Sequence, residues 1–206
     1  MQRRIITLLQ IDLEKADNAF GPVSTAADAF GILFEHEGLT RGITAGQYIS
    51  ADINEPDPRK AYLGYLARWI FRRSADDIED GYTPLNYDQW RTAVSDPRNT
   101  PTKRKSIDAV EQRTECIFAE VYVDEDRAEK ELGDGPIPYF SKEMEYAQQE
   151  GFCEIGSFIA DEDEDSLPHA YINFVADWVL YTHFEDISEY AGPLPYAQWA
   201  EHERVI

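Results

Sequence analysis

Two short runs of acidic side chains hold the densest charge in the sequence, DEDRAEKE at 124–131 and DEDEDS at 161–166. Carboxylates gathered in this way can bind a hard divalent cation through their oxygens, and they can also attract a basic protein surface. Equally, they can form a solvated surface that only keeps the protein in solution. The spacing of these residues along the chain helps to distinguish the three possibilities.

A metal site would draw on carboxylates that occur twice in the same pattern. Asp52 and Glu55 follow one predicted strand, and Asp161 and Glu164 follow another. Alternating oxygen ligands suit calcium, but neither stretch has the glycine at the sixth position or the distant glutamate of an EF-hand loop. Carboxylates that cap the next helix and complement its dipole are the simpler interpretation. We predict no bound metal, and a weak divalent-metal-dependent enzyme stays as an alternative.

Other catalytic chemistry has no recognisable motif in this sequence. The four histidines form no HExxH, and no G-x-S-x-G, P-loop or Rossmann glycine pattern occurs. Cys116 and Cys153 are the only cysteines, and they show neither a disulfide framework nor a zinc-knuckle spacing. We therefore predict a protein that is not an enzyme and that uses no cofactor.

The acidic charge is distributed very unevenly along the chain. Residues 1–105 hold 14 Lys and Arg against 15 Asp and Glu, a net charge of −1, whereas residues 106–206 hold 5 against 25, a net charge of −20. Adaptation to high salt would acidify both halves alike. A localised negative field instead favours a localised basic partner.

The size of that charge is compatible with mimicry of nucleic acid. DNA carries about one charge per 1.7 Å of helix axis, so about twenty charges correspond to roughly 34 Å of duplex. Both dense runs fall at predicted strand ends and loops, where carboxylates can project into solvent. The candidate partner-binding residues are Asp124, Glu125, Asp126, Asp161, Glu162, Asp163, Glu164 and Asp165.

An acidic, compact chain without a catalytic motif is similar in charge and size to DNA-mimicking anti-restriction and anti-CRISPR proteins, and to the immunity proteins that neutralise nuclease toxins. No shared motif underlies the similarity. It implies a cytoplasmic protein of a bacterial host cell that inhibits a basic, nucleic-acid-binding protein and binds no nucleic acid itself. A structural, assembly or solubility-adapted acidic protein with no inhibitory role is the alternative.

These acidic residues are carried on a sequence that repeats itself. A shift of 109 residues places 48–90 on 157–199 without gaps, and 14 of the 43 positions are identical. The clearest match is PLNYDQW at 84–90 with PLPYAQW at 193–199. A repeat of this length indicates two related units of about a hundred residues each.

Each half shows the same order of predicted elements. Apolar and β-branched runs predict strands, and 3.6-residue spacing predicts helices at 24–38, 57–73, 139–151 and 168–184. We therefore predict an α+β fold of two tandem homologous β-α-β-α units. The first spans 1–94, a polar and basic linker spans 95–107, and the second, strongly acidic unit spans 108–206.

The repeated heptapeptide supplies a large aromatic surface. Proline ends the preceding helical pattern, and the segment is predicted to pack back on the long helix of its own unit. The predicted core aromatics are Trp69, Trp90, Trp178, Trp199, Tyr87 and Tyr196. An aromatic ligand pocket is the less favoured interpretation of the same residues.

Basic residues cluster in the first half only. They are KRK at 103–105 in the predicted linker and Arg68, Arg72 and Arg73 on the first long helix, where the second half has Asp177, Tyr181 and Thr182. The linker is predicted to lie against the acidic half. No apolar run reaches the 18 residues of a membrane span, and the N-terminal apolar stretch is too short for a secretory signal.

Overall fold

The computed structural model describes residues 1–32, 34, 42–51, 55–95, 114–133, 135–149, 153–160 and 166–203. Helices and an antiparallel sheet occur together, so the predicted α+β class is confirmed. The chain divides into two compact units. We call residues 1–52 with 112–162 the sheet unit, and residues 53–111 with 163–206 the helical unit.

The sheet unit contains four strands in its described residues: β1 (Gln2–Asp12), β2 (Ile43–Ser50), β3 (Thr114–Asp124) and β4 (Cys153–Ala160). Their order is β2-β3-β1-β4, and each neighbouring pair is antiparallel. The first and second strands of each half are therefore separated by a strand from the other half. This is the strand order of a split β-α-β arrangement.

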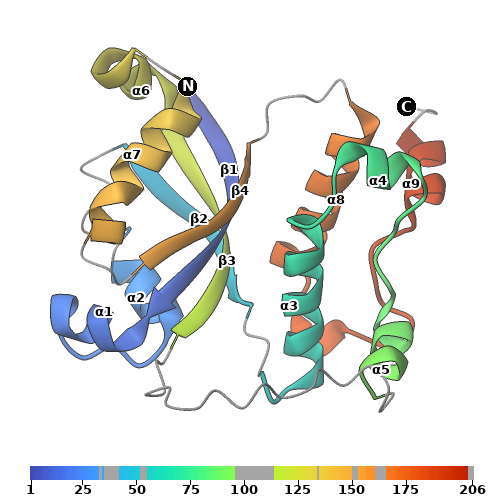
Figure 1. Cartoon of the computed structure of the whole chain (residues 1–206). Coiled ribbons are helices and arrows are strands. Elements are labelled where there is room, and N and C mark those ends of the chain that lie inside the picture. Colours follow the sequence, from blue (N-terminus) through green and yellow to red (C-terminus); the bar gives the residue numbers. More distant parts are fainter. Residues whose placement is uncertain are drawn as a thin grey trace. The chain divides into compact units, whose positions relative to one another are not determined.

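Four helices cover one face of this sheet, α1 (Leu13–Phe20), α2 (Ala26–Ile32), α6 (Glu125–Leu132) and α7 (Pro136–Gln149) (Figure 1). Alternate residues of the strands point toward them, as the two-residue period of a strand requires. Ile5, Leu9 and Ile11 of β1 pack in one core with Phe30 of α2 and Phe140 of α7. Each of these five side chains is buried.

Helices α1 and α6 were not expected from the sequence. Each starts directly after its strand, because the carboxylate of Asp12 or Asp124 accepts a hydrogen bond from the backbone of Lys15 or Arg127 and thereby caps the helix. The run 124–131 was predicted to be a strand end and loop, and that prediction is wrong: after Asp124 the run is helical. Its charged residues suit a solvated helix face, and Asp124 supplies the cap.

The helical unit has two sets of helices. The first half contributes α3 (Pro58–Ile70), α4 (Ala75–Glu79) and α5 (Tyr87–Ser95), and the second contributes α8 (Leu167–Tyr181), the 3-10 helix η3 (Phe184–Asp186) and α9 (Tyr196–Glu203). The long helices α3 and α8 pack together, α5 packs on α3, and α9 packs on α8. Each heptapeptide is thus an extended Pro-Leu entry followed by a helix that returns to the long helix of its own half.

The compact units do not follow the two sequence halves. Each unit takes one segment from the first half and one from the second. The described elements of each half run strand, two helices, strand and then further helices, rather than β-α-β-α. The repeat boundaries at 94 and 108 stay a prediction, and residues 96–107 of the predicted linker lie outside the described residues.

The two central strands, β1 and β3, pair symmetrically about one pair of residues. β1 and β3 are both eleven residues long, and an offset of 112 residues maps Gln2 of β1 onto Thr114 of β3. The same offset maps Thr7 onto Ala119, and these two residues are direct partners in the ladder. A two-fold rotation about the Thr7–Ala119 pair therefore exchanges the two strands in register.

Candidate functional site

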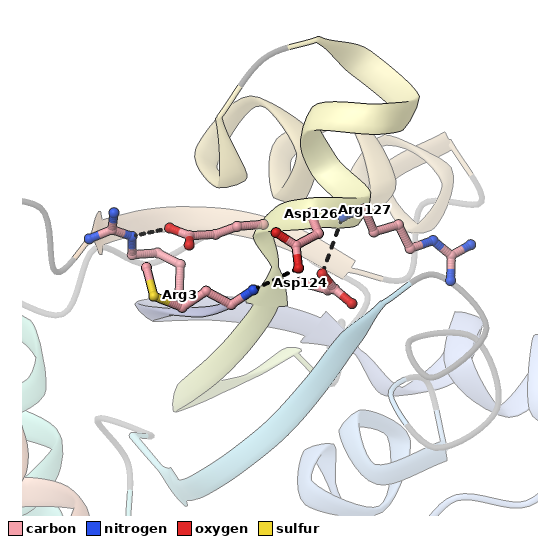
Figure 2. A network of polar contacts seen from close by, with 6 residues as sticks. Arg3, Asp124, Asp126 and Arg127 are labelled. Carbon is pink, nitrogen blue, oxygen red and sulfur yellow. Dashed lines mark hydrogen bonds and ion pairs between the residues drawn. The ribbon is translucent and has the colours of Figure 1, made fainter.

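The first acidic run lies at the junction of β3 and α6, where its carboxylates contact groups of the same unit. Figure 2 shows Asp124, Asp126 and Arg3 in this network. Arg3 Nε lies 2.8 Å from Glu125 Oε1, and the Met1 amino group lies 3.0 Å from Asp126 Oδ2. The hydrogen bond to Asp126 raises the pKa of that amino group. The three candidate residues of this run therefore stabilise local structure in addition to carrying charge.

Glu131, at the end of α6, is also compensated internally. Arg127 Nε lies 2.8 Å from Glu131 Oε1 one turn later, and the Tyr139 hydroxyl donates to Glu131 Oε2 at 3.2 Å. The hydrogen bond from Arg127 lowers the pKa of the Glu131 carboxyl. Such exposed i,i+4 pairs contribute only a few tenths of a kcal/mol. They nevertheless reduce the negative field that α6 presents to a partner.

The helical unit carries carboxylates of a different kind. Asp186, Glu189, Glu201 and Glu203 are exposed, and none has an ion-pair partner among the described residues. We call these four the acidic quartet. Glu185 precedes Asp186 in η3, and its Oε2 lies 3.9 Å from Nδ1 of His183. The candidate residues Asp161, Glu162, Asp163, Glu164 and Asp165 lie outside the described residues.

The charge of each unit shows where the asymmetry falls. The sheet unit holds 8 Lys and Arg against 21 Asp and Glu, and the helical unit holds 11 against 19, so their net charges are −13 and −8. In the helical unit, 53–111 holds ten basic and ten acidic residues, whereas 163–206 holds one and nine. Its entire net charge therefore comes from the second-half segment.

A cluster of aromatic rings joins the long helices of the helical unit. The Tyr62 hydroxyl donates to the Leu85 carbonyl at 2.8 Å, and the Tyr171 hydroxyl donates to the Leu194 carbonyl at 2.7 Å. The Tyr62 and Trp178 ring centroids lie 6.2 Å apart, and those of Tyr171 and Trp69 lie 6.4 Å apart. Both tyrosines are fully buried. Each tyrosine therefore fixes the heptapeptide of its own half and contacts a tryptophan of the other.

The predicted core aromatics all lie in this cluster, at different depths. Trp69, Tyr87 and Trp199 are 5%, 6% and 7% exposed. Trp90, Trp178 and Tyr196 are half-buried. Tyr87 and Tyr196 each make an edge contact with the buried tyrosine of their own half, at centroid distances of 5.4 and 5.3 Å. The rings thus pack mainly on one another.

The alternative metal site has little support in the described part of the chain. Within that part, no three His, Cys, Asp or Glu side chains are grouped so that they could hold a metal ion. Glu55 instead accepts a hydrogen bond from the Asp57 backbone at 3.3 Å. Asp52, Asp161 and Glu164 lie outside the described residues.

The two cysteines are separated by a strand. Cys116 on β3 pairs with Gln10, and Cys153 on β4 pairs with Ile11, so β1 lies between them. Two strand spacings of about 4.8 Å exceed the Cα separation of a disulfide, which is about 4.4–6.8 Å. Cys116 is buried.

Sequence reasoning missed one ion pair inside the sheet unit. Arg4 Nε lies 2.9 Å from Glu120 Oε2, and Glu120 Oε1 accepts a hydrogen bond from the Gln47 backbone at 2.9 Å. Glu120 sits opposite a bulge in β2, where a Cβ on Gly46 would clash with Glu120 Cγ. A glutamate inside the apolar strand at 116–123 was the available signal. Its contacts indicate a structural role.

No protein-family model, curated protein or solved structure matches this chain. None of the helices in the described ranges is both long and apolar enough to cross a membrane. The site must therefore be interpreted from its own chemistry.

Proposed function

We propose that this protein is a non-enzymatic acidic binding protein that inhibits a basic, nucleic-acid-binding partner by occupying its cationic surface. The observation that carries the proposal is the exposed acidic quartet in a segment with nine acidic residues and one basic residue. Exposed carboxylates without cation partners leave their full field available to a basic surface. The same field repels phosphate, which disfavours direct binding of nucleic acid.

Two groups of carboxylates differ in what they can offer a partner. Asp124, Glu125 and Asp126 already contact the backbone of Arg127, the Arg3 side chain and the Met1 amino group. A partner would have to replace those contacts before it gained from the new ones. The acidic quartet has no such contacts to lose, so we place the main partner contact there. The candidate run 161–165 precedes it in the same half of the sequence.

We further propose that the fold arose by internal duplication, so that the acidic segment and its near-neutral counterpart share one ancestor. The sheet order β2-β3-β1-β4 reads the same when the halves are exchanged. The tyrosine–carbonyl bonds of Tyr62 and Tyr171 recur at the 109-residue offset with nearly equal lengths.

The test compares two sets of four neutralising substitutions in the helical unit. The first set changes the acidic quartet through Asp186→Asn, Glu189→Gln, Glu201→Gln and Glu203→Gln. The second changes the exposed first-half residues Asp76, Glu79, Asp80 and Asp88 in the same way. Asp77 is left intact because its carboxylate accepts a hydrogen bond from the Ser74 backbone and completes a capping box.

Each tagged protein is used to capture heparin-binding proteins of the source organism at low and high salt. Wild type and the first-half variant are expected to retain the same basic protein at low salt and to lose it as the Debye length falls from about 10 Å at 0.1 M to about 3 Å at 1 M. The acidic-quartet variant should retain much less. Equal retention by both variants would contradict the proposal and favour a solubility role for the charge.

A further inference from the structure

A cavity of about 540 Å³ lies within the helical unit, and every described residue that lines it belongs to the segment 61–94. Its walls come from α3, the residues directly after α3, the connection between α4 and α5, and α5 itself, elements that follow one another along the chain in Figure 1. The volume lies within the roughly 300–1,000 Å³ range of small-molecule sites. Neither the acidic quartet nor the first acidic run lines the cavity.

Part of the lining of this cavity is aromatic. Tyr65, Trp69 and Trp90 line it, and Tyr82 contributes a further exposed ring. The Tyr65 hydroxyl accepts a hydrogen bond from the Leu85 backbone at 3.1 Å, which fixes the extended segment before α5 as part of the wall. Flat, rigid rings of this kind suit stacking on a planar ligand.

Another part of the lining is cationic. Arg68, Arg72 and Arg73 line it, and no carboxylate is found among the described lining residues. Three arginines around one cavity are unexpected in a chain of net charge −21. Guanidinium groups bind carboxylates and phosphates through paired hydrogen bonds.

Two of these arginines leave hydrogen-bonding capacity unused. Arg73 Nε is buried and has no hydrogen-bond partner, while its guanidinium carbon lies 5.1 Å from the centre of the Tyr82 ring. The Arg72 side chain is exposed and makes no hydrogen bond or ion pair with any described residue. A buried donor without a partner is costly unless a bound group satisfies it.

We propose that this cavity binds a small planar aromatic anion, an aromatic ring that carries a phosphate or a carboxylate. The ring would stack against Trp69 and Trp90, and the anionic group would accept hydrogen bonds from Arg72 and Arg73. At the positions of Arg68, Arg72 and Arg73, the second half has Asp177, Tyr181 and Thr182. The anion site therefore belongs to the first half alone, and it is independent of the proposed partner contact.

The test uses the intact protein and four probes: adenosine monophosphate, 1-naphthoate, adenosine and inorganic phosphate. Nuclear magnetic resonance follows the four tryptophan indole N–H signals. One or both aromatic anions are expected to shift the signals of Trp69 and Trp90 and to leave Trp178 and Trp199 unchanged. Adenosine has the aromatic ring without the anionic group, and inorganic phosphate has the anionic group without the ring. Each should therefore bind much more weakly.

Substitutions then separate charge recognition from a general apolar cavity. Arg72→Gln and Arg73→Gln should each weaken binding of the aromatic anion by about tenfold or more, the effect of one lost charge-assisted hydrogen bond. Arg59→Gln, which changes an arginine of α3 outside the cavity, is the control and should bind as wild type does. Arg72 is exposed, so its variant should fold even if the Arg73 variant does not.

Three results would overturn the proposal. Adenosine could bind as tightly as adenosine monophosphate, both arginine variants could bind as wild type does, or neither aromatic anion could shift Trp69 and Trp90 at millimolar concentration. Either of the first two results would mean that the cavity does not recognise an anionic group. The third would exclude this ligand class.

Discussion

The two halves of the helical unit use the same aromatic packing but differ in charge, since 53–111 is neutral and 163–206 has a net charge of −8. Around α3, Tyr62 holds the Leu85 carbonyl and three arginines line a cavity. Around α8, Tyr171 holds the Leu194 carbonyl, and the segment carries the exposed acidic quartet. The buried contacts are alike in the two halves, and the charged residues that differ lie outside them, on helices and on the turns that follow. Similar aromatic packing can therefore support segments of very different charge.

The largest expected effect tests whether the shared packing is equally important in both halves. Tyr62→Ala and Tyr171→Ala each remove a fully buried ring together with its hydroxyl. Each should lower the free energy of unfolding by roughly 3–5 kcal/mol, as for other large-to-alanine core changes. Chemical denaturation measures both. A loss at one tyrosine only would mean that the two halves do not share a core.

A second expected effect concerns alkaline pH. Burial raises the pKa of Tyr62 and Tyr171 well above the ordinary value. The folded state therefore keeps these protons after the unfolded state has lost them. Stability from this source is complete below about pH 10 and falls above it, by about 1.4 kcal/mol per pH unit for each tyrosine.

Denaturation between pH 9 and pH 12 measures this slope in wild type and in Tyr62→Phe and Tyr171→Phe. Each phenylalanine variant should show a shallower decline, and the double variant the shallowest. An unchanged slope in the double variant would show that other groups control alkaline unfolding.

A smaller effect is expected at the two helix caps of the sheet unit. Asp12→Ala and Asp124→Ala each remove an oxygen that accepts a backbone hydrogen bond in the first turn, from Lys15 or Arg127. Each should cost about 1 kcal/mol of stability. Asp17 is not a matched control because it bonds Val23, whereas exposed Glu14 is suitable. Thermal unfolding of Glu14→Ala should differ little from wild type.

The smallest effect on stability is expected for the charge variants. Neutralising the acidic quartet should change the free energy of unfolding by less than about 0.5 kcal/mol, because exposed charges contribute little. Neutralising the first-half set should change the free energy of unfolding by a similarly small amount. A large loss in either would mean that its carboxylates have structural partners, and binding data from that variant could not be interpreted.

The sequence predicted the elements whose apolar period is strong, and it failed where short polar segments take their structure from context. The predicted helices at 57–73 and 168–184 are present as α3 (Pro58–Ile70) and α8 (Leu167–Tyr181), and all the described strands were predicted, because these elements carry the cores. Both helices end three residues earlier than predicted, so Arg72 and Arg73 follow α3 and do not lie on it. Helices α1 and α6 were missed, since α6 is almost entirely charged and depends on the Asp124 cap. No local pattern could reveal that the halves exchange segments to form the sheet and helical units.

The strand ladders relate the two halves at a different offset from the sequence match. Tyr48 pairs with Ala119 and Phe158 pairs with Thr7, which relates Tyr48 to Phe158, whereas the match without gaps places Tyr48 on Ser157. The charge of the candidate site could be predicted from the sequence. The contacts made by Asp124, Glu125 and Asp126 could not, because they depend on the fold.

The most direct test of the central claim is release of nucleic acid from the captured partner. A fluorescent DNA or RNA duplex is bound to that partner, and its anisotropy is followed while this protein is added. Wild type and the first-half variant should displace the duplex, and the acidic-quartet variant should do so only at much higher concentration. If the partner keeps its duplex, or if the acidic-quartet variant displaces it as well as wild type does, the carboxylates of the second half are not the inhibitory surface.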